Sequence, residues 1–363
     1  MNKKAKKWTL ATVILMILAM LAIIALVAVV DPFFHYHKPL KSITYNVFDE
    51  RYQNYGIAKN FDYDAIIVGT SMTENFKATQ LDSLFSVNSV KTPFAGGTFK
   101  EVSDLLDVAI DNNPNLKMVV RSIDNNMLFN DKDLVSYSLD SYPTYLYDDN
   151  LLNDTKYVFN KSVVLNSIQN VLGVSEDGKL TTDFDAYGSW ANDYPIGASW
   201  VNRNYNRAAL TPADEQTPIS DAELENLRAS ISQNYIKQIE ANPDIDFYLF
   251  FPPYNIYYFD FYRMNGDLEK QLQAERVAVE MLVNYDNVHL YSFYTNYDLI
   301  WDISRYRDIG HYCSEINEEI LVWMHDGVGR ITPENCEAYC NEVYEYYTTL
   351  DYDAMYAQLS VLQ

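Results

Sequence analysis

The stretch DAIIVGTSMTENF, residues 64–76, contains the pattern that decides the fold. Its four apolar residues at 65–68 fit a strand that is covered on both faces, as in a parallel sheet. A glycine, a threonine and then Ser71 follow this strand at once. Open α/β sheets bind their ligands just beyond the carboxyl ends of their strands, so Ser71 lies where chemistry is expected.

Strand-like and helix-like segments alternate along the chain from about residue 61. This alternation predicts an α/β domain over residues 61–330, with a parallel sheet and helices on both faces. Residues from about 137 to 218, rich in Tyr, Asp and Asn, break the rhythm and are interpreted as a long insertion with some helix. A polar, tyrosine-rich helical tail is expected at 331–363. The predicted strands are 65–68, a short one within 86–98, 117–123, 246–251 and 287–293, and the predicted helices are 98–110, 221–239 and 268–283.

The N-terminus has a different composition. A basic tail at 1–8 contains four lysines, and residues 9–30 contain no charge. These 22 residues form about 33 Å of helix at ~1.5 Å per residue, which is enough to cross a bilayer. The run is longer than the core of a secretory signal and lacks a clear A-x-A cleavage site, so a transmembrane anchor is predicted, with a cleaved signal peptide as the alternative. The lysines predict a single-pass protein of the cell membrane with a cytoplasmic N-terminus and an extracellular domain.

A juxtamembrane extracellular segment is expected at 31–60. It begins with DPFFHYHKP, and its aromatic rings suit the outer membrane interface. His35 and His37 offer a metal-binding alternative, but no cysteine or carboxylate nearby completes a ligand set.

Charge and cysteine content exclude some classes of function. The 363 residues have a net charge of −23, and the only charges before Asp31 are positive. The remainder is therefore strongly acidic and is expected to repel nucleic acid and anionic lipid headgroups. Three cysteines cannot all pair within one chain, so no disulfide framework is expected. A single disulfide between two of them remains an alternative.

The segment RDIGHYC, residues 307–313, supplies the base that a nucleophilic serine needs. It places Asp308 three residues before His311, where a carboxylate can orient an imidazole. Ser71, Asp308 and His311 therefore form a candidate catalytic triad. The alternatives are structural: the DxxH pattern also occurs in surface turns, and Ser71 with Glu74 has the spacing of a helix-capping box.

These residues resemble the conserved blocks of the SGNH/GDSL hydrolase superfamily. The first block, usually Gly-Asp-Ser, corresponds to GTS at 69–71, with threonine in place of aspartate. The last block, Asp-x-x-His, corresponds to residues 308–311. The resemblance covers roughly residues 61–330 and implies a flavodoxin-like three-layer fold with a parallel sheet.

The two middle blocks of that superfamily supply the oxyanion hole. In the second block the resemblance implies a glycine whose N–H faces the oxyanion, and Gly96 or Gly97 in FAGGT matches it. The third block, usually Gly-x-Asn-Asp, corresponds to IDNN and lacks the glycine. Asn125 is the preferred match there, with Asn126 as the alternative.

More narrowly, the chain resembles membrane-anchored SGNH-like proteins of Gram-positive bacteria through its anchor, DPFFHYH, GTSMTENF, FFPPY and D-x-GHY. It is distantly similar to the D-alanyl transfer protein of teichoic acid tailoring and to alginate acetylation proteins. The resemblance implies a serine esterase or O-acyltransferase for acyl groups of envelope polysaccharide or a teichoic-acid-like polymer. It also implies a membrane-bound partner in acyl transfer, with no cofactor or metal. The alternative is a catalytically inactive SGNH module that binds polymer or a membrane partner.

Overall fold

The computed structural model describes residues 3–136, 143–147, 150–174 and 183–362. Contacts within the chain divide it into two units. The anchor unit comprises Met1–Asp62 and Tyr137–Asp183, and the sheet unit comprises Tyr63–Ser136 and Phe184–Gln363. The segment predicted as one insertion is thus divided between the units, and the segment predicted as a tail belongs to the sheet unit.

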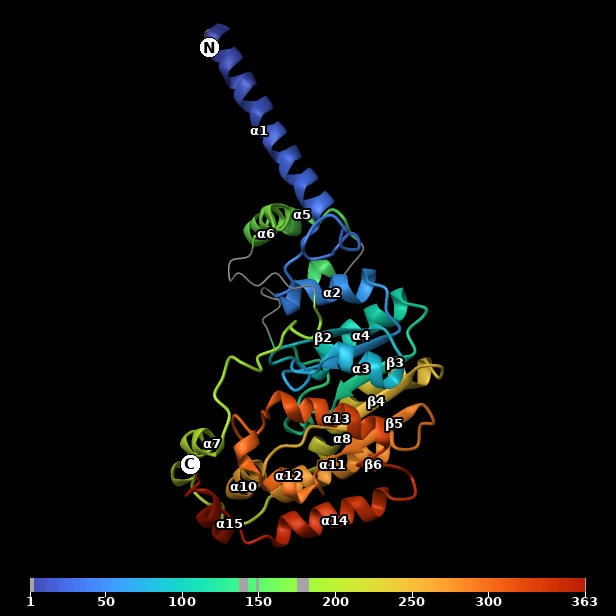
Figure 1. The fold of residues 1–363 in the computed structure, drawn as a ribbon, viewed down its shortest axis with the longest axis vertical. Helices are drawn as coiled ribbons and strands as arrows, with labels where there is room; N and C mark the ends of the chain where they lie inside the picture. The colour runs from blue at the N-terminus through green and yellow to red at the C-terminus, as the bar shows by residue number, and fades with distance from the viewer. Residues whose placement is uncertain (1–2, 137–142, 148–149, 175–182, 363) are drawn as a thin grey trace. The chain divides into compact units, whose positions relative to one another are not determined.

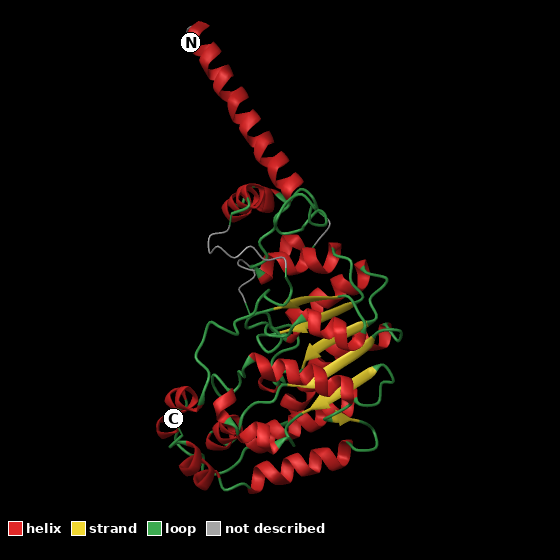
Figure 2. Cartoon of the chain, in the orientation of Figure 1, coloured by secondary structure: helices red, strands yellow, loops and turns green. Residues whose placement is uncertain are grey.

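A mostly parallel sheet of six strands, in the order β2-β1-β3-β4-β5-β6, forms the centre of the sheet unit (Figure 2). The first three strands are buried at every residue, as expected for strands covered on both faces. The order of the five parallel strands, 2-1-3-4-5, is that of flavodoxin-like sheets. The strands are β1 (Ala65–Gly69), β2 (Ser89–Pro93), β3 (Met118–Ser122), β4 (Asp246–Phe251), β5 (Val288–Ser292) and β6 (Arg330–Ile331).

The sixth strand corrects the prediction of a purely parallel sheet, because β6 pairs antiparallel with β5. In the last turn of the preceding helix, which ends at Asp326, Trp323 lies beside Phe293 with ring centroids 5.0 Å apart. The Ser292 N–H then donates to the Gly329 carbonyl over 3.0 Å. The chain therefore re-enters the sheet at the carboxyl end of β5 and runs back along it.

Helices cover the sheet in two groups. In one group α3 packs against β2 and α13, and in the other α8, α10 and α14 each contact α11 while η4 joins α4 to α8 (Figure 1). The short helical turns are η1 (Asn125–Met127), η3 (Arg207–Ala209), the π-helical η4 (Ser232–Ile236) and η5 (Ile303–Arg305). The helices are α3 (Ala78–Phe85), α4 (Phe99–Asn112), α7 (Ala198–Asn204), α8 (Asp221–Ile231), α9 (Lys237–Ala241), α10 (Ile256–Met264), α11 (Leu268–Leu282), α12 (Tyr297–Trp301), α13 (Ser314–Asp326), α14 (Cys336–Thr349) and α15 (Tyr352–Leu359).

The helix predicted at 98–110 begins at a capping box. The Thr98 side chain accepts from the Glu101 N–H, and the Glu101 carboxylate accepts from the Thr98 N–H. Such a reciprocal pair satisfies two of the N–H groups that a helix start leaves unpaired.

The C-terminal helices pack into the core of the sheet unit rather than extending from it. Tyr347 of α14 stacks on Phe259 of α10 at 3.7 Å between ring centroids. Tyr339, also on α14, donates to the buried Glu275 carboxylate of α11 over 2.5 Å. The C-terminal segment is therefore part of the packed core of the sheet unit.

The anchor unit contains α1 (Lys3–Val30), α2 (Glu50–Asn60), η2 (Thr144–Leu146), α5 (Thr155–Val158) and α6 (Lys161–Leu172). The first helix is long and apolar enough to cross a membrane, and it also includes most of the basic tail.

A buried carboxylate organises the turn that follows α1. Asp31 has a positive φ of 48° and accepts N–H groups from His35, Tyr36 and His37 at 2.7–3.0 Å. It also accepts the Tyr157 hydroxyl over 2.7 Å. The DPFFHYH segment therefore folds around Asp31.

Candidate active site

Ser71 lies in a tight turn directly beyond the carboxyl end of β1. Gly69 makes this turn feasible: its φ is +154°, and a Cβ there would lie 2.6 Å from the Thr73 side chain and 2.8 Å from Ser122 Oγ. The next helix, α3, begins only at Ala78 with Lys77 at its N-cap. The capping alternative for Ser71 is therefore wrong, and its hydroxyl is available to another partner.

That partner is His311. Ser71 Oγ and His311 Nε2 are 2.9 Å apart, and His311 Nδ1 lies 2.9 Å from Asp308 Oδ2. The three side chains thus form one hydrogen-bonded series across a sequence separation of 240 residues. This is the arrangement in which a carboxylate fixes an imidazole so that its other nitrogen faces a hydroxyl.

Backbone donors hold the Asp308 carboxylate in place. Asp308 Oδ1 accepts the N–H groups of Gly310 and His311 at 2.9 and 2.8 Å. Burial alone raises the pKa of Asp308, but hydrogen bonds from the His311 side chain and these N–H groups outweigh it and hold the pKa below its ordinary value. The carboxyl therefore stays ionised, as a partner of an imidazole must.

Two further contacts lock the histidine segment to the serine turn. The Tyr312 hydroxyl and the Asn317 amide both donate to the Met72 carbonyl, over 3.4 and 2.9 Å. The loop after β4 supports the same segment, since the Asn255 amide donates to the Asp308 carbonyl over 2.7 Å. FFPPYN, residues 250–255, thus helps to position Asp308.

A pocket of about 560 Å³ opens at this edge of the sheet. Its lining includes Ser71, Asp308 and His311 together with Gly96 and Asn126. Gly97 and Asn125 are not among its lining residues. The remaining walls are mostly aromatic or apolar, formed by Met72, Met127, Tyr254, Tyr258, Phe261, Tyr262 and Ile309.

The two asparagines left open by the sequence have different surroundings. Asn125 is fully buried, and its amide donates to Glu275 Oε2 over 3.1 Å. Asn126 lines the pocket, and its side-chain oxygen accepts the Tyr254 hydroxyl at 3.5 Å. Only Asn126 thus presents its side chain to the space beside Ser71.

Sequence reasoning did not assign a role to Asp124, which lies in the pocket wall and is 2% exposed. It accepts the hydroxyls of Ser122 and Thr70 at 2.8 and 3.0 Å. Burial raises the pKa of Asp124, against these two hydrogen bonds and the nearby His311. Thr70 thereby ties the serine turn to the end of β3.

Trp190, from the second half of the predicted insertion, also contacts the triad. Its ring meets the His311 ring edge to face, with centroids 5.7 Å apart. Its indole N–H donates to the Ser71 carbonyl over 3.4 Å. Arg307 stacks beside it on Tyr194, 3.5 Å from the ring centroid. No sequence signal distinguishes Trp190 from the other tryptophans.

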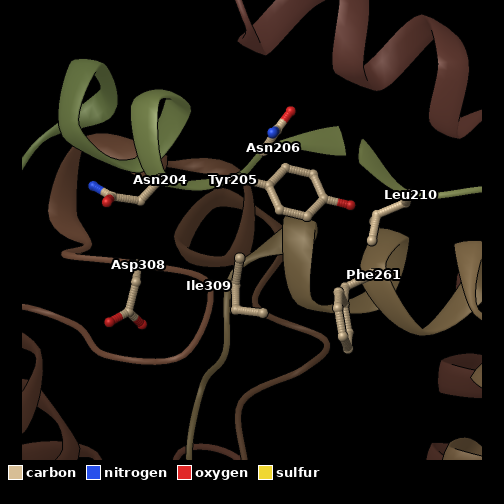
Figure 3. A pocket seen from close by; sticks show the side chains of 7 residues that line it. All are labelled: Asn204, Tyr205, Asn206, Leu210, Phe261, Asp308 and Ile309. Atoms are coloured by element: carbon tan, nitrogen blue, oxygen red, sulfur yellow. The ribbon is translucent and has the colours of Figure 1, made fainter. Parts of the chain in front are cut away.

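A second pocket of about 210 Å³ adjoins the first (Figure 3). Three residues line both pockets: Phe261, Asp308 and Ile309. In Figure 3 the Tyr205 ring lies above Ile309, with Phe261 to its right. Asn204, Asn206 and Leu210 complete the lining.

Within the described ranges, no group of three or more His, Cys, Asp or Glu side chains is placed to hold a metal ion.

No protein-family profile and no curated protein sequence matches the chain. A solved structure of a Streptococcus pneumonia protein, provisionally described as a platelet activating factor, is similar to it at 11% identity and a TM-score of 0.35. The alignment covers 77% of this chain and 90% of that one. A similarity this low does not place the chain in that protein's family.

Proposed function

We propose that the chain is an SGNH-type serine esterase or O-acyltransferase that acts on acyl groups of a cell-envelope polysaccharide or teichoic-acid-like polymer. The proposal includes a transmembrane α1, a cytoplasmic N-terminus and an extracellular sheet unit. The observation that carries it is the hydrogen-bonded series from Ser71 through His311 to Asp308 in the wall of a pocket.

The chemistry follows from this series. Ser71 Oγ attacks the ester carbonyl while His311 Nε2 accepts its proton, and the imidazolium is stabilised by Asp308. His311 then gives the proton to the departing alcohol, leaving an acyl group on Ser71. Water or a second hydroxyl, deprotonated by His311, removes that acyl group, which gives hydrolysis in one case and transfer in the other.

The negative oxygen formed in each step needs donors at the same edge. We assign this role to the backbone N–H groups of Ser71 and Gly96 and to the side-chain amide of Asn126. Gly96 and Asn126 line the pocket with Ser71. Donors aimed at the developing charge are usually among the largest contributions to such reactions.

The walls of the two pockets support a sugar as the alcohol part of the ester. Aromatic faces such as Tyr205 and Phe261 suit the apolar faces of a sugar ring, and the Asn204 and Asn206 amides suit its hydroxyls. The chain's net charge of −23 favours a neutral glycan over an unsubstituted polyanion.

One observation favours the alternative of an inactive binding module. Asn125, the preferred match to the family's oxyanion asparagine, turns its amide to Glu275 rather than to the pocket. If Asn126 cannot replace it, the fold retains a polymer-binding cleft without turnover.

Labelling with a fluorophosphonate separates the two functions, because only an activated serine is trapped. The full-length chain in detergent should be labelled at one site and should turn over an acetyl ester. Ser71→Ala should abolish both, whereas the control Ser304→Ala, at an exposed serine outside the pockets, should change neither. A folded wild-type chain that is neither labelled nor active overturns the enzymatic proposal.

A further inference from the structure

Helix α6 of the anchor unit has its polarity reversed. The residues that it buries include Asn166, Ser167 and Asn170. The residues that it exposes include four large apolar side chains, which we call the apolar face: Leu165, Ile168, Val171 and Leu172. A helix on a water-soluble surface shows the opposite pattern.

The buried polar side chains are held by local hydrogen bonds. Asn166 and Ser167 donate to the carbonyls of Ser162 and Val163 at 2.9 and 2.8 Å. Asn170 Oδ1 accepts the Asn46 N–H over 3.2 Å. The contact between Asn170 and Asn46 joins the polar side of α6 to the rest of the anchor unit, and the apolar side is exposed.

The apolar face is continuous along the helix. Leu165 lies three residues before Ile168, and Val171 and Leu172 lie three and four residues after it, so the four share one side of α6. Val174, just beyond the helix, and Phe159, just before it, are exposed as well. A contiguous apolar surface of this kind marks a contact with a membrane or another protein.

The charge around α6 differs from that of the rest of the chain. Residues 155–174 contain Lys156 and Lys161 and no acidic residue, in a protein with a net charge of −23. A stretch of this composition avoids the repulsion that the acidic remainder would have from anionic lipid headgroups.

The position of α6 favours lipid over protein as the partner. Both α5 and α6 contact α1, whose buried residues are Val27 and Val30 near its carboxyl end (Figure 1). The exposed apolar surface of α6 therefore continues from the outer end of the helix that we propose to span the membrane.

The length of α6 decides how it meets the bilayer. Its 12 residues correspond to about 18 Å of helix, well short of the roughly 30 Å hydrocarbon core. It also has defined ends: Asn160 caps its start, and Gly173 with φ 66° ends it. A complete short helix of this kind lies along the interface and does not span it.

We propose that α6 is an interfacial helix that inserts its apolar face into the outer leaflet of the membrane beside α1. This inference requires the transmembrane α1 but is independent of the catalytic proposal. It gives the anchor unit a second contact with the membrane besides the spanning helix.

Photocrosslinking to lipid tests the proposal. The full-length chain, reconstituted in nanodiscs of phosphatidylcholine and phosphatidylglycerol, carries p-benzoylphenylalanine in place of Ile168 or, separately, Leu172. The same probe replaces Leu18 of α1 as the positive control and Val328, an exposed residue of the sheet unit, as the negative control. Adducts are identified by mass spectrometry.

The Ile168 and Leu172 probes should yield phospholipid adducts in amounts comparable to Leu18 and at least about tenfold above Val328. Absence of lipid adducts at both positions, with Leu18 crosslinked, overturns the proposal. A protein adduct instead of lipid also overturns it and assigns the apolar face to a partner chain. If the probe at Leu18 yields no lipid adduct, α1 does not lie in the membrane, and the proposal, which requires a transmembrane α1, is overturned. Probes at Leu165 and Val171 repeat the test at different sites on the same face, in case one probe disturbs the fold.

Discussion

Replacement of Asp308 by asparagine tests the proposed chemistry at the atomic level. Asp308 Oδ1 accepts two backbone N–H groups, and His311 Nδ1 lies 2.9 Å from Oδ2 and 3.0 Å from Oδ1. An asparagine keeps the backbone contacts by leaving its oxygen at the Oδ1 position. Its NH₂ group then replaces Oδ2, and this donor at the position 2.9 Å from Nδ1 favours the imidazole in which Nδ1 is an acceptor.

The consequence is a change of tautomer. The imidazole proton moves to Nε2, the nitrogen that lies 2.9 Å from Ser71 Oγ. A protonated Nε2 cannot accept the serine proton, so the base is lost although every atom keeps its place. Asp308→Asn should therefore reduce kcat by ~10⁴-fold, or about 5 kcal/mol in activation free energy.

The assay is hydrolysis of an acetyl ester, with thermal melting as a check on the fold. The control Asp302→Asn changes an exposed aspartate that lies six residues earlier, outside both pockets, and should leave kcat within about twofold. A loss of less than about tenfold in Asp308→Asn would refute the proposed role of Asp308 in fixing the histidine tautomer.

Three further predictions concern the same edge of the sheet. Ser71→Ala and His311→Ala should each lower kcat by ~10⁴–10⁶, and the double variant should be no worse than either, since each group is useless alone; multiplicative losses would show that they act independently. Asn126→Ala should lower kcat by ~10²–10³ if its amide is an oxyanion donor. Asn125→Ala should mainly lower stability, and the opposite result would return the oxyanion role to Asn125. Burial raises the pKa of Glu275 to about 7. Because this folded-state pKa lies above the unfolded value near 4.3, Glu275 should cost stability progressively as the pH rises from about 4 to 7, on the order of 3 kcal/mol in total. In Glu275→Gln the free energy of unfolding, measured by urea titration at pH 5 and pH 8, should no longer show this loss. A pH dependence equal to that of the wild-type chain would contradict the role of Glu275.

The order of the five parallel strands was predictable because each is a short segment bounded by turn residues, whereas the helix α3 between β1 and β2 was not predicted. The antiparallel β6 was not, since two residues carry no periodicity and their direction depends on where α13 ends. The helix α10 after FFPPYN was also missed, because Pro252 and Pro253 indicate a turn rather than the start of a helix.

The site residues also divide into those that local sequence patterns indicate and those that only contacts distant in sequence identify. Ser71, Asp308 and His311 belong to short local sequence patterns, and the structure brings their side chains together. The choice between Asn125 and Asn126 depends on which side chain the turn η1 directs inward, and spacing alone does not determine this. Asp124 and Trp190 act through contacts with residues distant in sequence, so only the three-dimensional structure identifies them.

The contact between Trp190 and His311 has a spectroscopic consequence. A protonated imidazole quenches the fluorescence of an indole that touches it, whereas a neutral one does so weakly. With ring centroids 5.7 Å apart, Trp190 should therefore report the charge on His311 as a change in emission. The difference between the wild-type chain and Trp190→Phe isolates this signal from the other four tryptophans. The protein thus contains its own optical indicator of the imidazole that the proposed reaction protonates and deprotonates.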